Sequence, residues 1–383
     1  MASPSSSTRL FHPLPLTPSI TLTHRLAMAP LTRYRSSDAH VPLVPLMATY
    51  YAQRASSLPG TLLVTEATFI SPSAGGYANV PGIYNQSQID AWRHVTDAVH
   101  AAGGYIFCQL WSLGRTAHAD VAEKEGFVVH SSSAVPLPEE GTPVPVPVEM
   151  SVEEIRVRVG EYAAAARNAV EAGFDGVEIH GANGYLVDQF IQDTCNRRTD
   201  EYGGSVENRS RFAVEVVQAV VEAVGAERTA IRLSPWGRFQ GMRMADPVPQ
   251  FEDVISKIKG FGLAYLHLVQ TKVPGSADAP VAGGDDSLDF ALRLWDGPVL
   301  IAGGLTPKDA RYLVDEEFKD KDVIATFGRH FISTPDLPFR IKEGIELNPY
   351  DRSTFYLPQS PVGYIDQPFS KEFEALHGPQ ALN

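Results

Sequence analysis

The sequence predicts an α/β protein, and more specifically a (β/α)8 TIM barrel, from three observations. Short apolar runs of the length of buried strands recur eight times along the 383 residues. Helical patterns lie between most of these runs, which favours a parallel sheet. Polar or glycine residues follow nearly every run, as is typical of the carboxyl ends of barrel strands. A doubly wound open sheet is the alternative, but no GxGxxG follows the first strand, which disfavours a Rossmann dinucleotide-binding fold.

The eight predicted strands are short and strongly apolar. They cover residues 25–31, 62–65, 105–110, 176–179, 230–233, 265–269, 299–302 and 323–326. Pro30 ends the first strand, because proline has no N–H to donate to a neighbouring strand. Residues 1–23 are rich in Pro, Ser and Thr, and we interpret them as an irregular lead-in that can contain a short hairpin closing the bottom of the fold.

The predicted helices carry apolar residues three and four positions apart, as one buried helix face requires. They cover residues 43–56, 88–102, 151–172, 207–224, 251–259 and 307–318. Ser151 and Glu154 have the spacing of a capping box, which marks the start of the third helix. Glycines follow the second and third helices and end them.

We expect a single domain over residues 1–383, with its barrel core at about 24–345. Residues 111–150, after the third strand, are too long for an ordinary connection and include a proline-rich run. We predict that this insertion forms a cap or small hairpin over the site, with a loose surface loop as the alternative. The C-terminal segment, 346–383, is predicted to pack near the site.

Charge and cysteine content exclude several classes of function. With 32 basic and 45 acidic residues the net charge is −13, which argues against binding nucleic acid or an anionic membrane surface. Two cysteines, Cys108 and Cys195, imply no disulfide framework, and no CxxC or His/Cys cluster suggests a metal site. The first residues lack the apolar core of a secretory signal, and no stretch has the length of a membrane span. We therefore expect a cytoplasmic protein, with a weak organelle signal left open.

The densest group of polar residues follows the fourth strand. His180, Asn183 and Tyr185 fall within six residues, and the run NRRTDEYGG comes soon after. A simple polar turn would explain one histidine, but it does not need such a set. Because a barrel places its chemistry at the carboxyl ends of its strands, we predict that these three side chains belong to an active site.

Other strands are followed by residues that could converge on the same ligand. These are Thr32, Glu66, Ala67, Gln109, Trp111, Arg232, Gly303, Gly304, Gly328 and Arg329. Glycine-rich turns after the last two strands suit a phosphate group, since backbone N–H groups can approach it there. Arg329 could add a bidentate contact. One Gly-Gly turn alone is more often only a tight turn, so the pair of turns carries this prediction.

The chain resembles the old yellow enzyme family of flavin-dependent ene-reductases. The resemblance starts from HGANGYL and NRRTDEYGGSVENRSRF, and further matching segments occur in family order from about Leu26 to Tyr364. They are RLAMAPLTRYR, TLLVTEATFIS, FCQLWSLGR, IRLSP and FGRHFISTPDLPFRIKEGIELNPYDRSTFY. The similarity thus covers nearly the whole chain, and it looks nearer to the yeast, plant and fungal branch than to the thermophilic bacterial branch.

The resemblance implies tightly but non-covalently bound FMN, with NADPH as the reductant. Residues that match the family's flavin contacts are Pro30, Leu31, Thr32, Ala67, Gln109, Arg232, Gly303, Gly304, Gly328 and Arg329. Gln109 can both donate and accept at the pyrimidine edge of the flavin. Arg232 is costly to bury without a partner, and the flavin near N1 would be one. An internal salt bridge to a carboxylate is the alternative for Arg232.

The resemblance also implies reduction of the C=C bond of an α,β-unsaturated carbonyl compound, a small-molecule enone. His180 and Asn183 match the donors to the carbonyl oxygen, and Tyr185 matches the proton donor to the α-carbon. Trp111, Phe355 and Tyr356 match aromatic positions on the substrate side, with plain core packing as the alternative. Monomer and homodimer both stay open.

Three segments depart from the family pattern, and two rival functions remain; residues 111–150 and 236–250 are two of these segments. The family's Glu-Pro-Arg-like turn after the sixth strand is replaced here by the run VQTKVP, residues 269–274. One rival is a flavin-dependent isomerase or oxidase of fungal secondary metabolism. Some such relatives carry Phe where this chain has Tyr185, so the tyrosine favours net reduction. The other rival is a barrel that binds a phosphorylated ligand without redox turnover, which the yellow colour of a holoprotein would distinguish.

Overall fold

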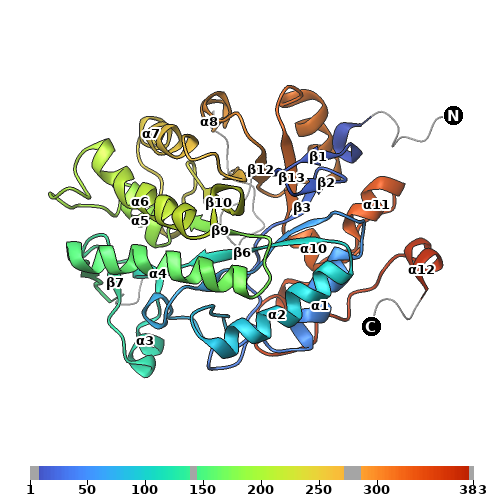
Figure 1. Ribbon diagram of the computed structural model, residues 1–383, viewed down its shortest axis with the longest axis horizontal. Helices are drawn as coiled ribbons and strands as arrows, with labels where there is room; N and C mark the ends of the chain where they lie inside the picture. Colours follow the sequence, from blue (N-terminus) through green and yellow to red (C-terminus); the bar gives the residue numbers. More distant parts are fainter. Residues whose placement is uncertain (1–7, 139–144, 271–285, 379–383) are drawn as a thin grey trace.

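A closed ring of eight parallel strands forms the centre of the computed structural model, which describes residues 8–138, 145–270 and 286–378 (Figure 1). Around the ring, the order is β4, β3, β13, β12, β11, β10, β9 and β6, and the pairing of β4 with β6 closes it. This confirms the predicted (β/α)8 barrel. The strands are β3 (Leu26–Met28), β4 (Leu62–Val64), β6 (Tyr105–Trp111), β9 (Gly176–Gly181), β10 (Thr229–Leu233), β11 (Tyr265–Val269), β12 (Val299–Ala302) and β13 (Val323–Phe327).

Six strands differ in length from their predicted ranges, and three of these differences concern residues near the carboxyl ends that matter below. β3 is shorter than 25–31, and its pairing ends with Ala29, whose N–H donates to Phe327, just before Pro30. β9 runs past residue 179, because His180 and Gly181 still pair with Arg232 and Leu233 of β10. β6 likewise includes Trp111, where the short strand β5 (Thr68–Phe69) joins it. His180 and Trp111 therefore lie at the ends of strands and not in the loops after them.

Helices surround the barrel and alternate with its strands (Figure 1). They include α1 (Leu46–Ala55), α2 (Gln86–Ala101), α4 (Val152–Glu171), α6 (Val206–Val224), α7 (Val248–Lys259), α8 (Asp289–Leu294) and α9 (Pro307–Tyr312). The capping box of Ser151 and Glu154 is present at the start of α4. The predicted helix 43–56 begins later, with Pro45 at its N-cap. The predicted helix 307–318 is α-helical only to Tyr312 and continues as a π-helix, Leu313–Glu317.

Shorter helices that the sequence did not predict lie near the rim and the C-terminus. They are α3 (Ala119–Glu125), α5 (Leu186–Ile191), α10 (Arg329–Ser333), α11 (Leu337–Glu343) and α12 (Lys371–His377). Single 3-10 turns cover Arg9–Phe11, Pro72–Ala74, Gly114–Thr116, Ala226–Arg228, Phe239–Gly241 and Arg352–Thr354. These helices have five to seven residues and the 3-10 turns have three, which is too few to show a clear helical period in the sequence.

The lower half of the barrel interior is apolar and is closed by an N-terminal hairpin. Strands β1 (Leu14–Pro15) and β2 (Thr21–Leu22) pair antiparallel. Their apolar side chains join one buried cluster with inward residues of the barrel. The cluster comprises Leu14, Leu16, Ile20, Leu22, Ala27, Leu62, Val64, Phe107, Ala230, Ala264, Tyr265, Leu300 and Ile324. The barrel is thus packed at its base, and any ligand must enter from the opposite end.

The insertion after β6 contains α3 and a pair of two-residue strands. β7 (His130–Ser131) and β8 (Val148–Glu149) pair parallel, so they do not form the small hairpin that was one expectation. A tight hairpin requires antiparallel strands, whereas the long connection here allows the chain to return in the same direction. Part of that connection, 139–144, lies outside the described residues. Arg115 fastens the insertion by donating to the carbonyl oxygens of Val135, Pro136 and Gln240.

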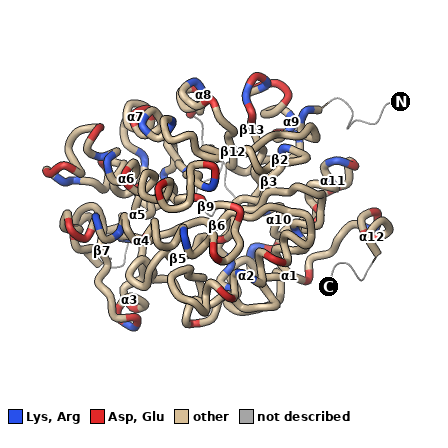
Figure 2. Tube along the Cα trace, in the orientation of Figure 1, with Lys and Arg blue, Asp and Glu red and all other residues tan. Residues whose placement is uncertain are grey.

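Charges of both signs are mixed along the outer helices and their loops (Figure 2). The net negative charge therefore does not form a single acidic face in this view. Within the parts of the chain that the structure describes, no helix is both long and apolar enough to cross a membrane.

Candidate active site

A cavity of about 590 Å³ opens at the carboxyl ends of the barrel strands. This volume lies within the range that small ligands and cofactors occupy. Every predicted cofactor residue lines it, namely Pro30, Leu31, Thr32, Ala67, Gln109, Arg232, Gly303, Gly304, Gly328 and Arg329. The predicted catalytic and substrate residues line it too, namely His180, Asn183, Tyr185, Trp111, Phe355 and Tyr356. The barrel thus brings together residues that are more than 300 positions apart in the chain.

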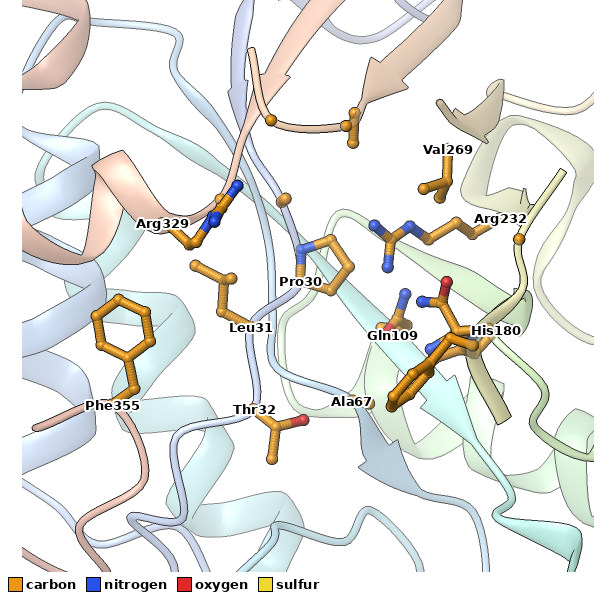
Figure 3. Close-up of a pocket in the computed structure, with 18 of the residues that line it drawn as sticks. Pro30, Leu31, Thr32, Ala67, Gln109, His180, Arg232, Val269, Arg329 and Phe355 are labelled. Carbon is orange, nitrogen blue, oxygen red and sulfur yellow. The ribbon is translucent and has the colours of Figure 1, made fainter. Parts of the chain in front are cut away.

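Polar side chains lie on two opposite sides of the cavity (Figure 3). Arg232, Gln109 and His180 lie together on one side, and Arg329 and Phe355 lie on the other. Pro30, Leu31 and Thr32 run between these two sides. A ligand that matches these two groups of residues would have a polar ring system at one end and an anionic group at the other.

The anion end is built from glycines and one arginine after the last two strands. Gly303 has φ 146°, and a Cβ there would approach Gln270 to 2.7 Å, so no side chain fits. Backbone N–H groups can therefore come close to a ligand. Arg329 lines the same end, and its guanidinium lies 5.7 Å from the centre of the Tyr350 ring. Helix α10 begins at Arg329 but has only five residues, so the arginine and the backbone, not a helix dipole, would favour an anion.

At the opposite end, the barrel holds a buried carboxylate that the sequence analysis missed. Gln109 Nε2 donates to Glu178 Oε1 at 2.7 Å, and His267 Nδ1 lies 2.8 Å from Glu178 Oε2. Burial alone would raise the pKa of Glu178, but His267, Arg232 and the two hydrogen bonds outweigh it and hold that pKa below its usual value. Nδ1 of His267 carries a proton toward Glu178, because an ionised carboxylate can only accept a hydrogen bond.

Arg232 lies beside this carboxylate, and a salt bridge to a carboxylate was the alternative to a flavin contact for this arginine. Its charge and that of Glu178 shift each other's pKa, yet the hydrogen bonds of Glu178 go to Gln109 and His267. Arg232 Nε is buried without a hydrogen-bond partner. A buried guanidinium N–H facing a cavity fits an acceptor on a ligand, and the pyrimidine carbonyl and ring nitrogen of FMN are such acceptors. The donors at the two ends of the cavity therefore suit FMN.

His180 is held as a neutral donor. The backbone N–H of Ala182 donates to His180 Nδ1 at 3.4 Å, so the remaining proton is on Nε2. Burial lowers the pKa of His180 well below its usual value, and the positive charge of Arg232 adds to that effect. The ring can therefore donate one hydrogen bond to a substrate without carrying charge.

Asn183 is positioned by the backbone of its loop. Its φ is 58°, in the left-handed region where Asn is tolerated better than most residues. Its N–H donates to Ser234 Oγ at 2.8 Å, and the N–H of Gly184 donates to the buried Asp188 at 2.8 Å. These two bonds fix the turn that carries Asn183 and Tyr185 to the cavity wall.

Tyr185 packs among aromatic rings and stays protonated. Its ring meets Trp111 edge to face at 4.7 Å and His180 at 4.8 Å between centroids. Burial of the hydroxyl, and after it the neighbouring Tyr77, raises the pKa of Tyr185 well above 10.0. The hydroxyl thus carries a proton throughout the physiological pH range, as a proton donor must.

Three aromatic residues form one wall of the cavity and differ in how deeply they are buried, namely Trp111, Phe355 and Tyr356. Trp111 is buried and stacks on Phe69 at 5.3 Å. Phe355 is also buried, whereas Tyr356 is 48% exposed and meets Tyr34 at 5.8 Å. Trp111 and Phe355 therefore serve the core and the cavity together.

Further lining residues were absent from the sequence prediction. They are Ala29, Tyr34, Tyr77, Gly237, Arg238, Phe239, Val269, Gln270, Ala302, Leu305, His330, Ile332 and Arg352. Several are strand-end neighbours of predicted residues and could have been found from that position alone. Arg238 and Phe239 belong to a loop with no such signal. In the unusual turn after β11, Val269 and Gln270 line the cavity, and residues 271–274 lie outside the described residues.

The chain is similar to known proteins over most of its length. Residues 9–348 match the model of the NADH:flavin oxidoreductase / NADH oxidase family. A chanoclavine-I aldehyde reductase of Penicillium roqueforti is 56% identical over 96% of this chain and 98% of that protein. An NADP-dependent oxidoreductase of Aspergillus flavus is 53% identical over 92% of this chain and 94% of its own length. A probable inactive reductase of Epichloe festucae var. lolii is 48% identical over 98% of this chain and 99% of its own length.

A solved structure shows the same fold. The crystal structure of Old Yellow Enzyme from a Pichia species has a TM-score of 0.86 and 38% identity, covering 95% of this chain and 94% of that chain. The predicted resemblance to the old yellow enzymes is confirmed.

Proposed function

The chain belongs to the NADH:flavin oxidoreductase / NADH oxidase family, and from this premise we propose that it is an FMN-dependent ene-reductase. In this proposal NADPH is the reductant, and the substrate is an α,β-unsaturated carbonyl compound. The observation that carries the proposal is the grouping of His180, Asn183 and Tyr185 on one cavity wall, with Tyr185 kept protonated. A site that only bound a phosphorylated ligand would not need these three groups together.

Each of the three residues has a task in this reaction. His180, neutral and protonated on Nε2, and Asn183 would donate to the carbonyl oxygen of the substrate. Two such donors polarise the conjugated C=C bond and stabilise the negative charge that grows on the oxygen. Tyr185 would give its proton to the α-carbon. Bound FMN would supply the hydride that reaches the β-carbon, having taken it from NADPH.

The cofactor contacts follow from the two ends of the cavity. Arg232 and Gln109 would hold the pyrimidine end of FMN, and Gly303, Gly304, Gly328 and Arg329 would hold the phosphate. Pro30, Leu31, Thr32 and Ala67 would line the ring between them. Because NADPH and the enone would use the same side of one cavity, we propose that they bind in turn, which gives ping-pong kinetics.

The proposed substrates are conjugated carbonyl compounds that an apolar wall of the cavity could hold. The Penicillium relative is named as an aldehyde reductase, so conjugated aldehydes should be tested together with enones. Trp111, Phe355 and the exposed Tyr356 would form the apolar wall for such a substrate.

The test is an anaerobic visible spectrum of the purified protein. Addition of NADPH should bleach the flavin band, and addition of 2-cyclohexenone or a conjugated aldehyde should restore it. A flavin band that bleaches and does not return with any activated alkene would support the FMN site but contradict the proposed ene-reductase activity. A colourless protein that FMN cannot reconstitute would contradict the cofactor as well.

A further inference from the structure

The barrel interior contains a polar layer directly below the proposed FMN ring. Gln109, Glu178, Arg232 and His267 come from β6, β9, β10 and β11, which are consecutive neighbours in the sheet. Gln109 lies opposite Glu178, and Arg232 lies opposite His267 in the strand register. All four are buried, with Glu178 and His267 at 0% exposure. Barrel interiors are normally filled with branched apolar side chains, so four adjacent polar residues need a reason.

Glu178 is the centre of this layer. It accepts from Gln109 Nε2 through one oxygen and from His267 Nδ1 through the other. It touches neither the substrate wall nor the anion end, and it does not line the cavity. A buried carboxylate is expensive to desolvate, and apolar residues of similar volume often give equal or better stability. Stability alone therefore does not account for it.

The first consequence of Glu178 concerns the orientation of Gln109. A carboxylate only accepts hydrogen bonds, so it holds the amide nitrogen of Gln109 on its own side. The carbonyl oxygen of Gln109 is thereby left for the cavity. If the amide flipped, two oxygens would face each other without a proton between them.

The second consequence concerns the charge of Arg232. Glu178 and Arg232 are buried on the adjacent strands β9 and β10, and their opposite charges shift each other's pKa, so the carboxylate balances part of the positive charge of Arg232. An unbalanced guanidinium next to the flavin would favour added negative charge, and reduction adds such charge. The carboxylate weakens that effect.

We propose that Glu178 is a positioning residue that fixes the amide of Gln109 and offsets the charge of Arg232, and thereby lowers the reduction potential of the bound FMN. The proposal rests on the proposed function, because it presupposes the FMN site. It adds a role for a residue that does not itself line the cavity.

The experiment compares the midpoint potential of FMN in holoproteins by equilibration with redox dyes. Glu178→Gln keeps the shape of the side chain and removes its charge. We expect the equilibrium to move at least tenfold toward reduced FMN, which is a positive shift of about 30 mV for a two-electron couple. Glu178→Asp keeps the charge and should keep the potential within a twofold change of that equilibrium, with weaker FMN binding because the contact to Gln109 is displaced.

The matched control is Asp188→Asn. Asp188 is equally buried and also accepts two hydrogen bonds, from Gly184 and Gln192, but it lies in α5 and its nearby cation is Arg115. Burial raises the pKa of Asp188 to about 7, so the potentials are compared at about pH 8, where both carboxylates are ionised. Replacing Asp188 should leave the potential unchanged. A shift of equal size in both variants would show a general effect of losing a buried carboxylate and would overturn the proposal.

The other outcomes are also decisive. A Glu178→Gln protein that binds FMN with an unchanged or lower potential contradicts the charge role. If that variant is insoluble, Glu178→Asp decides, since a potential that rises while the charge is retained contradicts the same role. Failure of the wild-type protein to bind FMN would instead refute the proposed function, so the two failures can be told apart.

Discussion

The ring of Tyr185 stands edge to face against the ring of His180, with 4.8 Å between their centroids. The two residues reach the cavity from different elements, since His180 is the second-last residue of β9 and Tyr185 is the N-cap of α5. The contact keeps a neutral hydrogen-bond donor beside a protonated hydroxyl. Both groups can therefore reach the same substrate molecule, and this relationship leads to the first prediction.

Tyr185→Phe should separate the two half-reactions. The ring contacts with Trp111 and His180 do not involve the hydroxyl, so the fold and the reduction of FMN by NADPH should persist. Reoxidation by 2-cyclohexenone should slow by about 100-fold or more, because the proton donor is lost. Anaerobic stopped-flow absorbance measures both steps. Unchanged reoxidation by the enone would show that Tyr185 is not the donor.

Arg329→Met should weaken the binding of FMN but not of riboflavin. Arg329 lines the anion end of the cavity, so only the ligand with a phosphate should lose an interaction. We expect the Kd of FMN to rise by about tenfold to a hundredfold, from the usual strength of a charged hydrogen bond. Flavin fluorescence quenching in the apoprotein measures both ligands. Arg238→Met, which removes another lining arginine, is the control, and equal losses for both flavins would contradict a phosphate contact at Arg329.

Arg33→Met should strongly destabilise the fold. The buried guanidinium donates to the carbonyl oxygens of Phe355 and Gly363 at 2.9 and 2.7 Å and to the Tyr50 hydroxyl at 3.1 Å. Its loss removes the donor to the Gly363 carbonyl and one of the two donors to the Phe355 carbonyl, which also accepts from Arg35 at 2.8 Å, at a cost of about 3–5 kcal/mol. Urea unfolding followed by circular dichroism measures the change.

Two further variants test the cause of that loss. Arg33→Lys should not rescue stability, because a single ammonium cannot replace the three directions of the guanidinium. Arg156→Met should change stability by less than about 0.5 kcal/mol, since its side chain is 64% exposed. A full rescue by Lys would mean that charge, and not the fork of hydrogen bonds, holds the C-terminal segment.

His24 should make the protein less stable in acid. Burial, with a smaller contribution from Lys342, lowers the pKa of His24 to about 4, whereas the unfolded chain has the ordinary value near 6.5. Between these values the unfolded state binds more protons, so stability is complete above pH 6.5 and falls as the pH drops toward 4. The loss from this group is about 3 kcal/mol at the lower end.

The measurement is urea unfolding at several pH values between 7.5 and 4. His24→Gln should lower stability at neutral pH, because the bond from the Leu26 N–H is lost, and should reduce its decline in acid. The exposed His94, replaced in the same way, is the control and should leave the decline unchanged. An equal decline in His24→Gln and wild type would show that other groups cause the acid sensitivity.

The sequence by itself determined the barrel and most of the cavity wall. Eight apolar runs with polar or glycine residues at their ends are sufficient to predict strands whose carboxyl ends meet. His180, Gln109, Arg232 and Arg329 each lie at or next to such an end, so their convergence follows from topology alone. The roles assigned to them came from the resemblance and stay predictions.

Only the tertiary structure showed the buried polar residues in the barrel interior and the contacts that hold the C-terminal segment against the cavity. Strands of a parallel barrel are buried on both faces, so their sequences do not alternate, and nothing in VEI or LHL shows that Glu178 and His267 point inward to the same place. The anchoring of Phe355 by Arg33 likewise joins residues 322 positions apart. Local patterns report the periodicity of one element, whereas such contacts depend on how elements pack in space, and no single segment of the chain contains that information.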